Sequence, residues 1–280
     1  SGLHEGAGER DGRVLNHMGF FEKIGRDTVA RVKGARDAFA VFGETCVDAL
    51  AALVRPRRFR FGDFALAFQR ASWDGLPVTT GIGWLLGVIL AFQCAAALQT
   101  FGVEIYVSDM LAIALFRELG PIVTAIVLAG RTGSAFAAEI GAMKINEELD
   151  ALTTMGLSPV RFLVLPRLAA AVLAMPVLTI CSELAGLAGG GLVLGLMNVP
   201  NPAYWDHVVS ATTAFMILFG LAKSMLFGFI VAVIGCAAGM NTRSAADGVG
   251  VAAPSAVVGS IVAIAVTDGL LAAICYVWGI

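Results

Sequence analysis

Apolar runs fill the chain from residue 76 to its end, and their lengths predict five membrane-spanning helices. Each run carries few charged residues and is long enough to cross a hydrocarbon core of roughly 30 Å. Pro121 interrupts the second run, and the third is long enough to tilt or to project from the membrane. The predicted spans are Leu76–Leu98, Ile113–Ala138, Leu163–Met197, Val208–Met240 and Val257–Ile280.

The N-terminal arm, residues 1–75, has a different pattern. Its first residues are polar and rich in glycine, and from Phe20 apolar residues recur at spacings of three and four with charges between them. This pattern predicts an amphipathic helix that is too charged to span a bilayer and lies in the interface instead. The alternative is a soluble amphipathic helix that packs on a further domain. Aromatic residues at positions 61–73 then predict a second, short interfacial helix that leads into the first span.

Composition supports the membrane class. Apolar residues make up 58% of the chain, charged residues only 14%, and the mean hydropathy is +0.83. Since a soluble domain carries about 25% charged residues, we expect an all-α polytopic membrane protein whose residues 76–280 form the transmembrane domain. The net charge of −2 and the lack of a long basic tract argue against a nucleic acid partner.

Lys and Arg are distributed unevenly between the loops, and this predicts an orientation. Segment 55–60, loop 139–161 and the loop that holds Arg243 contain basic residues, whereas loops 99–110 and 198–207 contain no Lys or Arg. The positive-inside rule therefore places the N-terminus in the cytoplasm and the C-terminus outside. The odd number of spans and the lack of an internal repeat argue against an inverted-repeat carrier. A homodimer would supply symmetry instead.

Several ionisable residues fall inside the predicted spans, where each costs about 2.5–3.5 kcal/mol on insertion scales unless it is paired or faces water. We interpret Arg117, Glu118 and Lys223 as lining a polar cavity that handles a charged or amphipathic substrate. Asp268 is interpreted as a structural partner, and Glu183 has no assigned role. The alternative is that all these charges form ion pairs that only fix the register of the helices.

The chain lacks the common catalytic motifs. It contains no GxxxxGK[ST] loop for ATP, no HExxH, no CxxC and no Ser/His/Asp spacing. Its three histidines lie outside the predicted spans without neighbouring metal ligands, so no metal site and no bound cofactor are expected. The polypeptide is therefore predicted to be non-catalytic on its own.

A charged segment between the second and third spans predicts a short amphipathic helix. Ile145, Leu149, Leu152 and Met155 fall on one face of about four helical turns, with the acidic residues elsewhere. Gly156 is placed to end this helix, and Pro159 prevents its continuation. A helix of this kind on the cytoplasmic side suits docking of a soluble partner. The alternative, a helix resting on lipid, is disfavoured because anionic headgroups repel its negative charge.

Residues 118–170 carry a family resemblance. Their sequence, ELGPIVTAIVLAGRTGSAFAAEIGAMKINEELDALTTMGLSPVRFLVLPRLAA, resembles the MlaE/YrbE family of ABC-type lipid permeases. The family pattern is roughly ELGP, AGRxGSAxAAELGxM, EQIDAL, MGxxP and then PR. This chain departs from it at Ile140, at Glu148-Leu149, and in residues 249–258, where the family has GVGxATTxAVV.

The resemblance implies an assembly. It implies a homodimeric, multi-pass permease of the bacterial inner membrane, with five spans and an N-terminal interfacial helix in each protomer. A separate cytoplasmic ABC ATPase would bind ATP and Mg²⁺, and a periplasmic MCE-domain protein, expected to be a hexamer, would exchange phospholipid with the membrane. A STAS-domain subunit is a further expected partner.

The resemblance also implies residue roles. Arg117, Glu118 and Lys223 match polar positions near the family's lipid cavity. Segment Glu139–Met155 matches the coupling helix that fits a groove on the ATPase, with the candidate contact residues Glu139, Met143, Glu147, Glu148, Asp150, Leu152 and Met155. Two other functions stay open from the residues alone. One is a stand-alone ion-coupled carrier with Glu118, Lys223 and Asp268 as a relay, and the other is a non-transporting membrane scaffold.

Overall fold

The computed structural model describes residues 43, 60–242 and 247–278. Nearly all of this part is helical, and no strand occurs within it. The predicted interfacial helix of the arm, the arginines at positions 55–58 and Arg243 lie outside the described residues. The all-α prediction for the membrane domain is confirmed.

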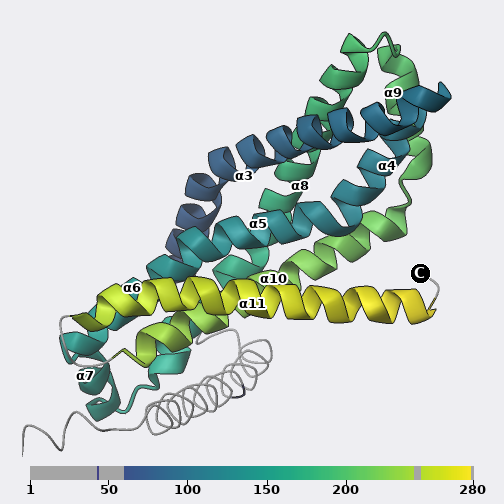
Figure 1. Cartoon of the computed structure of the whole chain (residues 1–280). Coiled ribbons are helices and arrows are strands. Elements are labelled where there is room, and N and C mark those ends of the chain that lie inside the picture. Colours follow the sequence, from purple (N-terminus) through teal and green to yellow (C-terminus); the bar gives the residue numbers. More distant parts are fainter. Residues whose placement is uncertain (1–42, 44–59, 243–246, 279–280) are drawn as a thin grey trace, which may run out of the picture.

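Five helical runs in the described part are long and apolar enough to cross a membrane, which confirms the predicted number of spans. They lie side by side in an elongated bundle, with α7 and α9 near its opposite ends (Figure 1). The five runs are Phe61–Phe101, Glu104–Ile145, Val160–Leu196, Ala214–Met240 and Gly250–Val277.

Three of the predicted boundaries are wrong. Helix α3 (Phe61–Leu98) is continuous from Phe61, so the predicted second interfacial helix is the beginning of the first span. Helix α11 (Asp247–Trp278) begins ten residues before Val257, the predicted start of the fifth span. The predicted fourth span is two helices, α9 (Asn201–Ala211) and α10 (Ala214–Met240), because the backbone at Thr212 and Thr213 is extended.

Helix α3 packs mainly on α8 (Leu165–Leu196), and small residues determine this contact. Every fourth residue of α3 along this face is small and buried: Ala71, Gly75, Thr79, Gly83, Gly87, Ala91 and Ala95. A Cβ added at Gly87 would lie 1.8 Å from the carbonyl oxygen of Gly186. The two backbones therefore approach closely, as small residues in membrane helices allow.

The second span is one helical run with two π-helical turns in it. It comprises α4 (Val107–Ala114), a π-helical segment Leu115–Leu119, α5 (Gly120–Leu128), a second π-helical segment Ala129–Gly133 and α6 (Ser134–Ile145). Pro121 explains the first segment, because proline has no N–H and its ring collides with the carbonyl four residues earlier. The π-helical turn lets the span continue past Pro121 and leaves the Arg117 carbonyl without its usual helical donor.

The apolar interior is divided into two clusters. One gathers residues of α5, α6, α7, α8, α10 and α11, including Leu128, Leu178 and Phe227. The other gathers residues of α3, α4, α8 and α9, including Leu111 and Leu187. Along the helices, Arg117, Glu118, Glu183 and Lys223 fall between these two clusters. A level of charged side chains therefore separates the two apolar clusters.

Helix α9 closes the end of the bundle opposite α7. The Tyr204 hydroxyl donates a hydrogen bond of 2.7 Å to the carbonyl of Leu187, and Nδ1 of His207 lies 3.0 Å from Oδ1 of Asp109. Burial raises the pKa of the Tyr204 hydroxyl above its usual value, so it remains a donor at any physiological pH. These two contacts attach α9 to α8 and α4.

We expect Gly87→Ala to destabilise the bundle by about 3 kcal/mol, because the new methyl group meets backbone and no side chain can move aside. Thermal unfolding of the detergent-purified protein measures this effect. Gly81→Ala is the matched control, since a Cβ added at Gly81 on the same helix has nothing within 4 Å. Equal unfolding temperatures for the two variants would contradict the close approach of α3 and α8.

Candidate functional site

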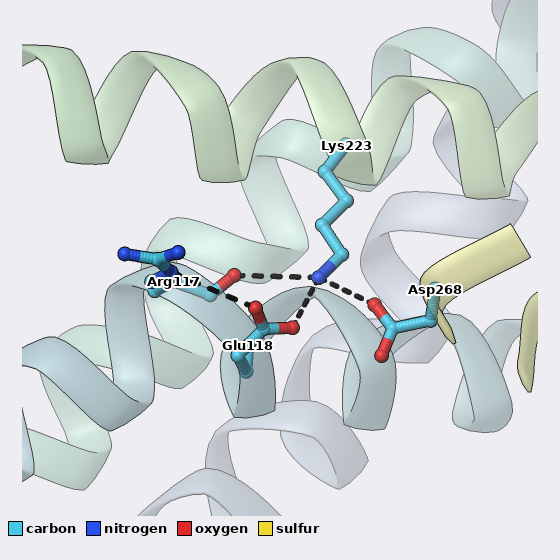
Figure 2. Close-up of polar contacts among 4 residues, drawn as sticks. All are labelled: Arg117, Glu118, Lys223 and Asp268. Atoms are coloured by element: carbon cyan, nitrogen blue, oxygen red, sulfur yellow. Dashed lines mark hydrogen bonds and ion pairs between the residues drawn. The ribbon is translucent and has the colours of Figure 1, made fainter. Parts of the chain in front are cut away.

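A buried lysine joins three of the five spans. Lys223 lies on α10, and its side chain is only 1% exposed. Its ammonium group pairs with Oε2 of Glu118 on the second span and with Oδ1 of Asp268 on α11 (Figure 2). The sequence analysis placed Glu118 and Lys223 in a cavity and treated Asp268 as a structural partner. The structure brings all three side chains together.

Arg117 completes this group, which we call the Lys223 cluster: Arg117, Glu118, Lys223 and Asp268. The Lys223 ammonium donates to the Arg117 carbonyl at 3.5 Å, the same carbonyl that Pro121 leaves without a helical donor. Nε of Arg117 lies 3.8 Å from Oε1 of Glu118. In Figure 2 the Arg117 guanidinium points away from Lys223 while its carbonyl points toward it. The π-helical turn therefore places both a carboxylate and a backbone acceptor around the ammonium.

The cluster is buried on one side and accessible on the other. Asp268 is 18% exposed, whereas the side chains of Arg117 and Glu118 are 37% and 33% exposed. Two cations and two carboxylates make the cluster neutral in total, so its burial is far less costly than that of a lone charge. Chemically, the accessible guanidinium and carboxylate offer hydrogen-bond donors and acceptors to a polar group that enters the apolar bundle.

Glu183 is a separate buried carboxyl at the same level. It lies on α8, is 2% exposed, and packs beside Gly120, where an added Cβ would lie 2.6 Å from the Glu183 carboxyl. Among the described residues no basic side chain is within ion-pair distance of it. The structure thus shows why residue 120 is small, because a larger side chain would displace Glu183.

The predicted coupling helix has a bend that the sequence pattern does not reveal. Helix α6 ends at Ile145, Glu147 has a left-handed backbone with φ of 60°, and α7 (Glu148–Thr154) follows. The prediction of one helix of about four turns from Ile145 to Met155 is therefore wrong, since Ile145 belongs to the end of the second span. The predicted end at Gly156 is confirmed.

The C-terminus of α7 is fixed by a Schellman motif. Gly156 has φ of 74°, its N–H donates to the Thr153 carbonyl at 3.0 Å, and the Leu157 N–H donates to the Leu152 carbonyl at 3.0 Å. Glycine adopts this left-handed conformation without steric cost. Pro159 then precedes the next helical run instead of merely ending the last one. The residue at which α7 ends is thus specified by local backbone geometry.

The seven predicted coupling residues separate into two groups. Leu152 is buried in the chain's own core together with Leu149, so it anchors α7 and does not face outward. Met143 packs partly against the same core, and Glu139 pairs with Arg167 at 2.9 Å. Leu152 and Met143 thus pack within the chain, whereas the Glu139 side chain is 43% exposed and stays a candidate contact residue. The exposed residues of the predicted set are Glu139, Glu147, Glu148, Asp150 and Met155.

The sequence analysis missed a cleft between α3, α6 and α8. This cleft, of about 470 Å³, is lined by both arginines and carboxylates, among them Arg131 and Arg167. The sequence pattern gives no indication that these two arginines, which belong to different spans, face a common space. The only signal was that three different spans each carry charges near the same predicted end.

Comparisons with known proteins cover the same region. A family model described as Permease MlaE matches residues 64–274. The chain is 40% identical over 187 residues to a probable ABC transporter permease protein of Synechocystis, spanning 66% of this chain and 71% of the relative. It is 34% identical over 196 residues to the intermembrane phospholipid transport system permease protein MlaE of Haemophilus influenzae, spanning 69% and 75%. It is 35% identical over 204 residues to the chloroplastic protein TRIGALACTOSYLDIACYLGLYCEROL 1 of Arabidopsis thaliana, spanning 72% and 58%.

We expect Lys223→Met to destabilise the protein by about 3–5 kcal/mol, because it leaves the largely buried Asp268 carboxylate without its cation and removes one of the two cations beside Glu118. Neutralising those partners as well, in a Lys223→Met, Glu118→Gln and Asp268→Asn triple variant, should restore most of the lost stability. Thermal unfolding in detergent measures both effects. A triple variant that is less stable than Lys223→Met alone would contradict the assignment of these three residues as one ion-paired unit.

Proposed function

We propose that this chain is the membrane subunit through which an ABC transporter moves phospholipids. The premise is that the chain belongs to the MlaE permease family. The family membership confirms the resemblance found in residues 118–170 and identifies the chain as a permease rather than an enzyme. The phospholipid substrate is inferred from the Haemophilus influenzae relative, whose name describes intermembrane phospholipid transport. Energy is supplied in this proposal by a separate ATPase subunit.

The Lys223 cluster carries the proposal. A phospholipid combines apolar chains with a charged head, and a carrier must offer polar contacts inside an apolar bundle. Arg117 and Glu118 are about one-third exposed at a level that lies between the two apolar clusters. A guanidinium matches the geometry of a phosphate group. This accessible side of the cluster therefore suits transient contact with a lipid head, while Lys223 and Asp268 hold it in place.

Helix α7 supports docking of the ATPase. Three exposed carboxylates, those of Glu147, Glu148 and Asp150, lie at its start, and Leu149 and Leu152 fasten the helix to the core. Since α6 is the last part of the second span and α7 follows it directly, a force on α7 acts on the span that holds Glu118. That span provides a direct mechanical connection between an ATPase at one end and the Lys223 cluster.

The remaining partners belong to the same proposal. The protein is a homodimer in the bacterial inner membrane and exchanges phospholipid with a periplasmic MCE-domain hexamer, with a STAS-domain subunit as a further partner. The exposed face of α11 supports contact with lipid or with a second copy. Large apolar side chains recur there at every fourth residue: Val258, Val262, Val266, Leu270 and Ile274.

An ion-coupled carrier is the second candidate, and one observation favours it. Lys223 touches carboxylates from two different spans, so a proton could pass between Glu118 and Asp268 by way of the ammonium. Such a carrier would work without nucleotide. Dependence on ATP therefore distinguishes the two functions.

Transfer between vesicles tests the proposal. The chain is copurified with its ATPase, reconstituted with fluorescent phospholipid, and assayed for transfer to acceptor vesicles carrying the MCE-domain protein. We expect transfer that requires ATP and stops when the ATPase carries an inactivating substitution in its nucleotide site. Transfer of ions or lipid by the chain alone, without nucleotide, would contradict the proposal and favour the carrier.

We expect the double variant Glu147→Lys and Glu148→Lys to weaken copurification of the ATPase by about tenfold or more, because it reverses the charge at the exposed start of α7. Pull-down yield on the tagged permease measures this loss. Asp206→Lys, which reverses an exposed carboxylate on α9 at the other end of the bundle, is the matched control. Unchanged yield in the double variant would remove α7 from the interface.

A further inference from the structure

The cleft between α3, α6 and α8 is amphipathic. Its volume of about 470 Å³ lies within the range typical of ligand sites, roughly 300–1,000 Å³. Leu66, Phe136 and Phe162 supply apolar walls, and three arginines supply positive charge. A space with both kinds of surface at the end of a membrane bundle suits a molecule that is itself apolar at one end and charged at the other.

The arginines of the cleft are only partly engaged. Arg70 lies 3.6 Å from Glu139, and Arg131 lies 3.9 Å from Asp74, with all four side chains between 43% and 63% exposed. These are long, solvated pairs of the kind that contribute little to stability. Because a guanidinium has five N–H donors, both arginines retain donors that can bind an acceptor in the cleft.

The lining of the cleft carries three arginines and three carboxylates and is neutral on its own, while Arg60 beside it adds one positive charge. Asp63 at its edge is paired with Arg60 at 2.8 Å, and the Arg60 guanidinium lies 4.1 Å from the centre of the Phe162 ring. The remaining groups are three guanidiniums against the carboxylates of Asp74 and Glu139. Arg167 is held firmly by Glu139, at 2.9 Å. With Arg60 included, the cleft and its edge carry one positive charge in excess, which matches the single negative charge of a phosphodiester.

This cleft is distinct from the Lys223 cluster. Arg131 follows Glu118 by 13 residues on the same helical run, which places them about 20 Å apart along the helix at 1.5 Å per residue. None of the residues of the Lys223 cluster lines the cleft. A lipid head cannot contact both places at once.

We propose that the α3–α6–α8 cleft is a second phospholipid site, in which Arg70 and Arg131 bind the phosphodiester and the aromatic walls hold the beginning of the acyl chains. The proposal rests on the lipid-transport function above and adds to it a station near the membrane surface, at the end that carries α7. A phospholipid would occupy this station before or after it reaches the level of the Lys223 cluster.

Photo-crosslinking in cells labelled with radioactive phosphate tests the site. A benzoylphenylalanine at Leu66, in the cleft, should capture a labelled adduct that phospholipase removes from the denatured protein. The same probe at Leu157, exposed beyond α7 and outside the cleft, should capture much less. Free phosphate would not survive denaturation. No labelled adduct at Leu66, or a crosslink from Leu66 to residues 1–59 of the same chain, would overturn the proposal.

Substitution of Arg70 and Arg131 tests whether these two arginines bind the phosphodiester. Arg70→Ala with Arg131→Ala should lower the labelled adduct at Leu66 by more than about tenfold, because the loss of even one charged hydrogen bond costs about tenfold in affinity. Arg131→Gln alone, which alters one exposed pair, should lower it in a fully folded protein. Arg161→Ala removes an arginine at the same end but outside the cleft and should leave the adduct unchanged. Equal adduct in all variants would overturn the assignment.

The crosslinking result for the cleft can be told apart from the result of the ATP-driven transfer assay. ATP-driven transfer without any lipid adduct in the cleft would reject this site and leave the transport function standing. A lipid adduct in the cleft of a protein that shows no ATP-driven transfer would support the site and reject the transport function.

Discussion

The neutralisation of Lys223 is the constraint on which the arrangement of the spans depends. A lysine with a 1% exposed side chain on a membrane helix requires counter-charges at its own level. The second span supplies Glu118 and the Arg117 carbonyl, and α11 supplies Asp268. Since each group must reach one ammonium, the registers of three helices are set together. The small-residue contact of α3 with α8 then closes the bundle on the other side.

The same constraint gives the second span its shape. Pro121 would break an ordinary helix, yet the π-helical turn before it both accommodates the ring and directs Glu118 and the Arg117 carbonyl to Lys223. The span then continues through a second π-helical segment to α6, and the left-handed Glu147 separates α6 from α7. The Lys223 cluster and the exposed carboxylates of α7 are thus joined by one span and one bend, and the arginine-lined cleft lies beside the α6 end of that span.

Much of this architecture is predictable from the sequence, and the exceptions have physical causes. Hydropathy predicts the number of spans because each span needs a long apolar run. Gly156 predicts the end of α7 because glycine adopts a positive φ without steric cost. Hydropathy does not report backbone angles, so the extended Thr212–Thr213 and the left-handed Glu147 were missed. Nor does it report neighbours in space. Asp268 and Lys223 are 45 residues apart in the chain, and the cleft is assembled from three separate segments.

The central claim is that the Lys223 cluster handles lipid as well as holding the fold. The most direct test is the rate of ATP-driven phospholipid transfer by the reconstituted complex in which Lys223, Glu118 and Asp268 are replaced by Met, Gln and Asn. Because this variant keeps the side-chain sizes and removes only the charges, it separates folding from function. The account predicts a folded complex whose transfer falls to the level seen without ATP. Transfer at the wild-type rate by the folded variant would contradict it and leave these charges as purely structural.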